Sequence, residues 1–511
     1  MRLPREVGRR TRTAALLWAL ALVISFFGLS KLVPVGLIGD DFVVYMQGLA
    51  QLWSKDSFGS YIASNLSDLT TGNHVLPVAA LFWAIYVRGA ELLSHTPLSV
   101  SESWGVFRVA SIVIAEIAAA FFMASWGRLS RLSFGFLRRS TLSYFLIISC
   151  VTLATIQIHA VWSNDPVISY SLASWGTAVF AFLYGGAIAR ILTTRQSKLW
   201  LWGLALPVFG ILGVLSYEMM LGAIAAGGIS IVVYIVLNFR NRPSWIRLAW
   251  LATGVAIPFV TLAFTQWLRW QQPQTYAGTT GGYAALVIPV FKTGVLGSVP
   301  LSSGSLAIQY GEGFPPRLLD VLLPLIAILL LLGFLYLINR PIMTARTKTV
   351  SFSLPALLSQ VAFLLALWCV STLIFAASSK YQVEIGQTIG HVYLFYSVGL
   401  LSVSCLLVIG FLIIGGRTKV SFVLVALVVL IPLAIIQGGF NSRSLQVLDR
   451  DMTWTKVLAD QLGEPGTESE RCTAFGEIAV RELPDWYSSG LIAGIESAYQ
   501  NRYGQEFCPN G

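Results

Sequence analysis

Two adjacent carboxylates, Asp40 and Asp41, follow a long apolar segment in the sequence GLIGDDFVVYM, residues 36–46. A carboxylate at such a position can act as a general base toward a hydroxyl group. Like charges this close also tend to raise one of the two pKa values, which favours a base. We favour Asp41 as that base, because Asp40 follows Gly39 and could cap a helix over residues 42–53. The alternative is that both acids only stabilise the N-terminus of this helix.

A few other charged and histidine side chains fall near the ends of apolar segments on the same predicted side. They are His74, Asp165, Glu218, Arg269, Lys292, Arg317, Lys380, Glu384 and His391. Charges close to a bilayer are costly and are often functional. Arginine and lysine bind phosphate, and carboxylates can take the proton of an acceptor. The set predicts substrate binding and group transfer from a lipid phosphate, although each residue alone could be a solvated loop charge.

Long apolar segments must position these residues. Of the 511 residues, 56% are hydrophobic and only 11% are charged, whereas soluble proteins average about 25% charged residues. Apolar runs of about 20 residues, enough to cross a bilayer, recur along the chain. Because the alternation typical of a barrel is missing from the sequence, we predict an all-α polytopic membrane protein. The predicted spans are 14–36, 105–126, 141–160, 171–190, 199–217, 222–239, 249–268, 319–338, 354–376, 397–415 and 420–437.

Basic residues set the predicted topology, since they favour the cytoplasmic side of a membrane. Most of them lie in six stretches, namely the N-terminus, 128–139, 190–198, 240–247, 340–348 and 417–419. With all six inside, the N-terminus is inside and the C-terminus is outside. The apolar run 75–87 is too short for a span. Residues 37–104 are therefore predicted as an outer loop with a helix on or in the membrane surface, and residues 269–318 as a second outer loop.

The composition changes after the last span, which divides the chain into a membrane domain, 1–437, and a tail, 438–511. The tail holds 11 acidic and 6 basic residues. We predict a small outer α/β domain, with helices over 446–462 and 487–503 and a strand in TAFGEIAVREL, residues 473–483. Cys472 and Cys508 are the only cysteines of the tail. An oxidising compartment would allow them to form a disulfide bond, and two free thiols are the alternative.

An acidic pair after the first span, a long first outer loop with a short membrane-surface helix, and many spans together resemble the GT-C superfamily of integral-membrane glycosyltransferases. The stretches GNHVLP (72–77) and SYE (216–218) are also similar to pieces of bacterial members. The resemblance covers about residues 1–440 in architecture. It implies that an acid of the first outer loop, here Asp40 or Asp41, is catalytic. The chain lacks a motif like WWDYG, so transfer of a whole oligosaccharide to asparagine is not expected.

The resemblance also implies a reaction and a location. The donor would be a polyprenyl-phosphate-linked sugar, and the acceptor a cell-envelope glycan or lipid. The base would deprotonate the acceptor hydroxyl, and the polyprenyl phosphate would leave with inversion at the anomeric carbon. The enzyme would lie in a bacterial inner membrane with its active site on the extracytoplasmic side. A divalent metal, Mg²⁺ or Mn²⁺, could bind at the acid pair, and no nucleic-acid partner is expected.

Two other functions stay open from the residues alone. A transporter or flippase of a lipid-linked sugar would place charges near the middle of the membrane, and Glu116 lies in the middle of a predicted span. Here most charges fall at the outer edge, and no internal repeat is evident. A membrane acyltransferase or polysaccharide ligase would use a histidine or arginine centre, for which His74 and His391 are the candidates.

Overall fold

The structure is a computed structural model of the chain. It describes residues 3–36, 40–55, 57–71, 76–130, 140–159, 165–168, 171–271, 281–343, 352–386, 391–392, 394–417, 422–463, 466–480 and 485–509. At some helical positions, among them Asp40, Asp41 and Glu384, only the backbone is described. The described residues are almost entirely helical, and their one strand-like feature is an isolated bridge between Gly281 and Ser378.

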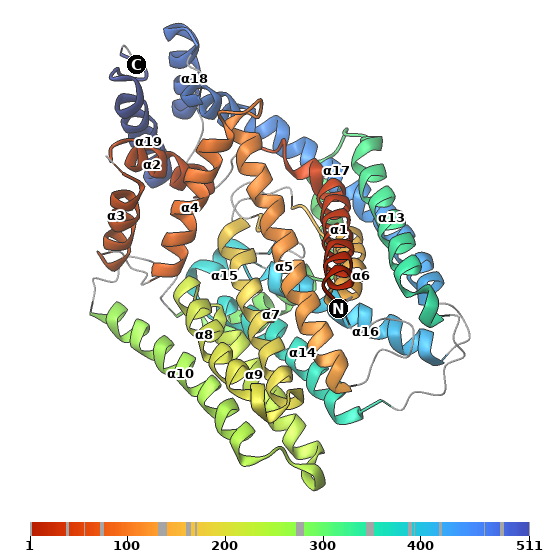
Figure 1. Ribbon diagram of the computed structural model, residues 1–511. Helices are drawn as coiled ribbons and strands as arrows, with labels where there is room; N and C mark the ends of the chain where they lie inside the picture. The colour runs from red at the N-terminus through yellow and green to blue at the C-terminus, as the bar shows by residue number, and fades with distance from the viewer. Residues whose placement is uncertain are drawn as a thin grey trace.

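Ten of the described helices are long and apolar enough to cross a membrane. They are α1 (Leu3–Leu29), α5 (Val100–Ser130), α7 (Ser171–Thr193), α8 (Leu199–Ser216), α9 (Met220–Leu237), α10 (Trp245–Trp270), α13 (Leu318–Met343), α14 (Leu354–Ala376), α16 (Tyr396–Arg417) and α17 (Phe422–Gly463). Each contains most of one predicted span. The chain therefore has the architecture of a multi-pass α-helical membrane protein (Figure 1).

The remaining predicted span, 141–160, is the shorter apolar helix α6 (Thr141–Thr155), which has 15 residues. After α6 the backbone is extended, and other helices satisfy its polar groups. Asn441 of α17 donates from Nδ2 to the carbonyl oxygen of Ile156 (2.8 Å) and accepts from the amide of Ile158 (2.9 Å). The hydroxyl oxygen of Tyr396 accepts from the amide of Gln157 (2.7 Å). Non-helical backbone near a membrane is stable only with such partners.

Loops that the basic residues assign to one side of the membrane lie at one end of the bundle. The amide of Ser353, before α14, donates to the carbonyl oxygen of Ser130 at the end of α5 (2.9 Å). The guanidinium of Arg247 donates to carbonyl oxygens of Leu192 and Thr194, at the end of α7. The ends of α5 and α7 therefore lie beside the starts of α14 and α10. That this end is cytoplasmic stays a prediction.

A second hydrophobic core lies apart from the spans. It joins α2 (Asp40–Trp53), α3 (Phe58–Thr71) and α4 (Pro77–Leu93) to the C-terminal part of α17, α18 (Glu468–Val480) and α19 (Asp485–Tyr503), and we refer to these elements as the α2–α19 unit. Figure 1 shows α2, α3, α4, α18 and α19 together at the upper left. Asn501 of α19 donates to the carbonyl oxygen of Ala50 in α2 (2.9 Å). The first loop and the tail therefore form one folded unit on one side of the bundle.

Two long elements connect this unit to the spans. α17 has 42 residues, and at 1.5 Å per residue it is about 63 Å long, roughly twice the thickness of a hydrocarbon core. Its second half therefore extends beyond the membrane as one continuous helix. At the start of α5, the fully buried Trp104 lies 4.8 Å from Tyr45 of α2 and 5.9 Å from Trp83 of α4, between ring centroids.

The predicted α/β character of the tail is wrong for the residues that the structure describes. The segment that we predicted as a strand from residue 473 is helical up to Val480, within α18. A capping box begins this helix, since Glu470 accepts from the amide of Thr467 (2.8 Å) and Thr467 Oγ1 accepts from the amide of Glu470 (3.3 Å). The buried residues Arg471, Ala474 and Ile478 then recur at helical spacing.

A disulfide bond between Cys472 and Cys508 ties α18 to the segment after α19, with the two Cα atoms 5.0 Å apart. It closes a loop of 36 residues, for which the chain-entropy model gives a stabilisation of about 3–4 kcal/mol. We expect Cys472→Ser to make the tail much more susceptible to limited proteolysis under non-reducing conditions. The free, half-buried Cys369 in α14 offers the control Cys369→Ser. Equal cleavage rates of both variants and the parent protein would contradict this prediction.

Candidate functional site

The acid pair lies where the first span meets the α2–α19 unit. Asp40 and Asp41 are the first two residues of α2. The chain reaches them from α1 through a short 3₁₀ turn, Ser30–Leu32, and the segment Val33–Gly36. Residues 37–39 and the side chains of the pair lie outside the described part of the chain. The geometry of the site is therefore given by the residues that hold the segment before it.

A buried arginine holds this segment. Arg108, in the first third of α5, is fully buried. Its guanidinium donates to the carbonyl oxygens of Leu32 (2.9 Å), Val35 (3.2 Å) and Gly36 (3.3 Å). These carbonyl groups follow the end of α1, where no intrahelical donor is left for them. Arg108 thus determines where the chain leaves the first span, only a few residues before the acid pair.

Close backbone approach completes this arrangement. A Cβ atom on Gly105, one turn before Arg108, would lie 2.1 Å from the carbonyl oxygen of Val33. Only glycine allows α5 to come so near to the segment. On its other side, a Cβ atom on Gly36 would lie 2.9 Å from Cγ of Lys456 in α17. The segment before the acid pair is therefore enclosed by α5 and α17.

The sequence alone had assigned no role to Arg108. It is the only basic residue within the predicted span 105–126. A single arginine inside an apolar run is unusual, because burial of a charge is costly unless it is hydrogen-bonded. That signal was available in the sequence. Its partners were not, since they are carbonyl oxygens more than 70 positions away.

Asp165 organises the segment between α6 and α7. Its side chain is fully buried, and its oxygens accept from the amides of His159 (2.5 Å), Val167 (2.8 Å) and Ile168 (3.1 Å). Nδ1 of His159 lies 3.7 Å from Oδ2 of Asp165. The His159 ring is buried and packs edge-on against Tyr396, with centroids 5.2 Å apart. Sequence reasoning missed His159, for which the only signal was its place six positions before Asp165.

Glu218 and Arg269 form an ion pair. Glu218 lies between α8 and α9, and Arg269 lies at the end of α10. The arginine side chain is 7% exposed and the glutamate side chain 27%. Gln266, one turn before Arg269, also donates to Glu218 (3.4 Å). The carboxylate therefore already neutralises the charge of Arg269, which we had proposed as a phosphate ligand.

The other predicted bases fall in two places. Lys292 is exposed on α11 (Ala284–Gly297) and Lys380 lies on α15 (Ser379–Ile385), and these two helices are in contact. The ammonium of Lys380 lies 5.5 Å from the centroid of the Tyr381 ring. Arg317, in contrast, precedes α13 and lies 3.8 Å from Asp449 of α17.

Of the two predicted histidines, His391 is half-buried between α15 and α16, whereas His74 lies outside the described residues.

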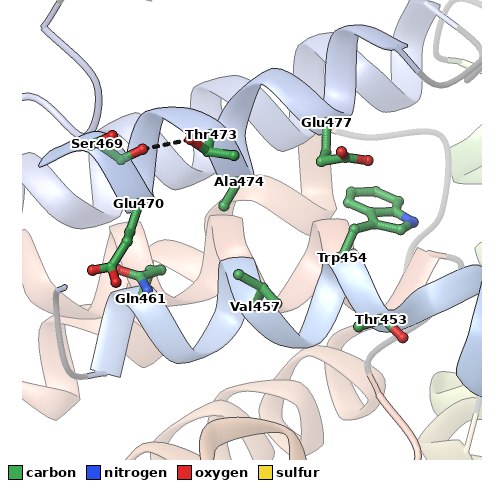
Figure 2. Close-up of a pocket in the computed structure, with 9 residues that line it drawn as sticks. All are labelled: Thr453, Trp454, Val457, Gln461, Ser469, Glu470, Thr473, Ala474 and Glu477. Atoms are coloured by element: carbon green, nitrogen blue, oxygen red, sulfur yellow. Dashed lines mark hydrogen bonds between the residues drawn. The ribbon is translucent and has the colours of Figure 1, made fainter. Parts of the chain in front are cut away.

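A groove with a volume of about 540 Å³ lies between α17 and α18 in the α2–α19 unit. Figure 2 shows Trp454 and Val457 of α17 facing Ala474 of α18. Both charged side chains of its lining, Glu470 and Glu477, are acidic. Like charges repel, so this groove does not suit a phosphate.

A buried carboxyl group lies within the spans. Glu116 of α5 is fully buried, and its Oε2 accepts from Ser25 Oγ of α1 (3.0 Å) and Ser149 Oγ of α6 (2.6 Å). Among the described residues, no cation forms an ion pair with it. Two hydroxyl donors suit a structural link between three helices.

We therefore expect Glu116→Gln to retain both stability and activity, because an amide keeps the shape and an oxygen acceptor. Glu116→Leu should lower the free energy of unfolding by about 1–3 kcal/mol, since it leaves two buried hydroxyl groups without their acceptor. Thermal unfolding of the purified variants in detergent checks that Glu116→Gln is as stable as the parent protein and that Glu116→Leu is less stable. If Glu116→Gln folds but is inactive, an ionisable group is required there, as a proton-coupled transporter would need.

A metal site is not evident in the described part of the chain. Within it, no three histidine, cysteine, aspartate or glutamate residues come together as metal ligands. The side chains of the acid pair lie outside that part, so Mg²⁺ or Mn²⁺ binding there stays a prediction. Comparison of the chain with protein-family models, with curated proteins and with solved structures finds no match in any of the three.

Proposed function

We propose that the protein is an inverting membrane glycosyltransferase. It moves a sugar from a polyprenyl-phosphate donor to a glycan or lipid acceptor of the bacterial cell envelope, at the extracytoplasmic face of the inner membrane. The observation that supports the proposal is that Asp40 and Asp41 begin α2 a few residues after the segment that Arg108 and Gly105 contact at the end of the first span.

This position suits a reaction between a lipid-borne and a water-borne substrate. The backbone of Asp40 and Asp41 begins α2, eight residues after a candidate span ends at Leu32 and where the α2–α19 unit begins. The donor phosphate of a membrane lipid lies at the level of the span ends, and an acceptor hydroxyl would approach from the side of the unit. A carboxylate that acts as a base at this boundary can contact both the lipid-borne donor and the water-borne acceptor. A carboxylate within the spans could reach only the lipid.

In the proposed reaction, Asp41 takes the proton of the acceptor hydroxyl, and the oxygen attacks the anomeric carbon from the side opposite the phosphate. The bond from that carbon to the phosphate oxygen breaks, and the polyprenyl phosphate leaves with the negative charge. Phosphate is a good leaving group, so no general acid is needed. Asp40 orients Asp41, the loop around His74, or a divalent metal. Basic residues near the span ends neutralise the charge on the leaving phosphate.

A transfer assay tests the proposal. The purified protein in lipid nanodiscs is incubated with radiolabelled polyprenyl-phosphate hexose or pentose and with an envelope extract as the source of acceptor. We expect label to move into glycan or lipid acceptor with release of polyprenyl phosphate. In sealed vesicles, label that crosses the membrane while still linked to the polyprenyl phosphate would instead identify a flippase. If neither occurs with any donor, the glycosyltransferase proposal fails.

A further inference from the structure

A cavity of about 470 Å³ lies between the end of α1, the start of α13 and the middle of α17. Figure 1 shows these three helices side by side, at the right of the view, and α13 contacts both α1 and α17. Three basic residues line the cavity: Lys31 in the 3₁₀ turn after α1, Arg317 just before α13, and Lys456 in the second half of α17. Of these, sequence reasoning had proposed only Arg317 as a phosphate ligand.

Lys31 has donors left for a ligand. The residue is only 8% exposed, although it lines the cavity. Its ammonium donates to the carbonyl oxygen of Asp320 at 3.1 Å, which is its one hydrogen-bond acceptor among the described residues. An ammonium has three N–H donors. Two of them therefore remain for an acceptor within the cavity, and a buried donor without an acceptor is unfavourable.

The charges of the lining favour an anion with one negative charge. Asp449 is shared by two bases, since it lies 2.5 Å from Lys456 Nζ and 3.8 Å from Arg317 Nη2. The second acid, Asp320, accepts from Ser442 Oγ (2.7 Å). Three bases and two acids leave the cavity with a net charge of about +1. A phosphodiester carries one negative charge at neutral pH, so it matches this balance better than a more highly charged phosphate.

The surroundings place that phosphodiester on a lipid. The candidate spans of α1 and α13 end at Leu32 and begin at Leu318, so Lys31 and Arg317 lie at the level where a membrane has its phosphate groups. Beside the cavity, Leu318 and Leu319 are 70% and 67% exposed. Such apolar side chains on a span are stable against hydrocarbon chains rather than water.

We propose that this cavity binds the phosphodiester headgroup of a membrane lipid, with Lys31, Arg317 and Lys456 around the phosphate and the hydrocarbon chain along α1 and α13. Lys456 also contacts Gly36, four residues before Asp40. The cavity therefore adjoins the segment that leads to the acid pair. Identifying the lipid with the sugar donor rests on the proposed function, whereas phosphodiester binding itself does not.

The experiment uses the full chain in non-ionic detergent micelles, which contain no phosphate, and measures retained lipid by native mass spectrometry. The added probes are phosphatidylglycerol and undecaprenyl-phosphoryl-glucose, both phosphodiesters, and soluble glycerol 3-phosphate. We expect at least one lipid probe to bind to the parent protein, and Lys31→Met to weaken its binding by about tenfold or more, because a charged hydrogen bond to phosphate is lost. Arg317→Gln should weaken it as well, and because the side chain of Arg317 is 56% exposed, this substitution should leave the fold intact.

The control is Arg88→Gln on α4, a partly exposed base of the α2–α19 unit that does not line the cavity. It should bind lipid like the parent protein. Binding of undecaprenyl-phosphoryl-glucose alone would identify the donor, and equal binding of phosphatidylglycerol would identify a general headgroup site. The proposal is overturned if Lys31→Met and Arg317→Gln both bind the lipid probes like the parent protein, or if glycerol 3-phosphate binds as well as the lipids. Neither outcome depends on the transfer assay, so the two proposals fail separately.

Discussion

Replacing Asp41 with asparagine is expected to reduce sugar transfer by about a hundredfold to ten-thousandfold, the usual contribution of a general base. Asparagine keeps the shape of the side chain but cannot take a proton at neutral pH. It also remains a good residue at the start of a helix, so α2 should still form. Initial rates with labelled donor, at equal amounts of folded protein, measure the effect. The loss should appear in kcat rather than in KM, because the base acts on the reacting hydroxyl.

The variant Asp40→Asn distinguishes the role of Asp40 from that of Asp41. If Asp40 has a positioning role, its replacement should reduce the rate less than that of Asp41 and should lower stability slightly, by up to about 1 kcal/mol, through the loss of a charge at a helix N-terminus. Glu506→Gln, at an exposed acid of the tail, is the matched control and should leave transfer unchanged. Near-full activity in both Asp40→Asn and Asp41→Asn would mean that the pair only stabilises α2, and the proposed function would lose its main support.

The second large effect is expected for Arg108→Met. Methionine fills part of the space, but it leaves the carbonyl oxygens of Leu32, Val35 and Gly36 without the donor that now contacts them. Hydrogen bonds to a charged group contribute about 1.5–3 kcal/mol, and a buried carbonyl without a partner costs about 1–3 kcal/mol. We therefore expect a loss of about 3 kcal/mol or more in the free energy of unfolding, measured as a lower midpoint of thermal unfolding in detergent.

Arg450→Met is the control for this variant. Arg450 is an exposed arginine on α17 that pairs with the neighbouring, partly exposed Asp451 at 2.6 Å. Exposed ion pairs contribute little, about 1 kcal/mol or less, so this variant should unfold near the parent protein. If Arg108→Met unfolds at the same temperature as Arg450→Met, the guanidinium does not hold the segment before the acid pair. Arg108→Lys should be intermediate, because one ammonium cannot contact all three carbonyl groups in the same fork geometry.

The amino-acid sequence by itself determined the spans. Whether about 20 residues can cross a bilayer depends on the sum of their own transfer free energies, which needs no knowledge of neighbours. Ten of the eleven predicted spans therefore coincide with the ten long apolar helices, the eleventh falls on the shorter α6, and the run at 75–87 is not among the ten. The helix after the acid pair could also be predicted, because Gly39 and the acids are local signals for a helix start and α2 begins at Asp40.

Local sequence signals were insufficient where two signals disagree or where contacts with distant helices decide the backbone conformation. The segment from residue 473 was predicted as a strand from a short apolar run, although Thr467 and Glu470 already carried the capping-box pattern of a helix. The early end of α6 could not be predicted at all. Its last predicted residues leave the helix because Tyr396 and Asn441, from helices 239 to 285 positions later, satisfy the backbone there.

Only the tertiary structure decided how the candidate sites are built. Arg108 contacts carbonyl groups more than 70 positions earlier, and Lys31 donates to an oxygen 289 positions later. The cavity that we propose for a lipid phosphate likewise combines bases from three separate segments. Arg269, which the sequence predicted as a substrate-binding base, is paired with Glu218 instead. The hydropathy and charge of a residue determine how costly it is to bury. Which partners offset that cost depends on how the helices pack, and packing is a property of the whole chain.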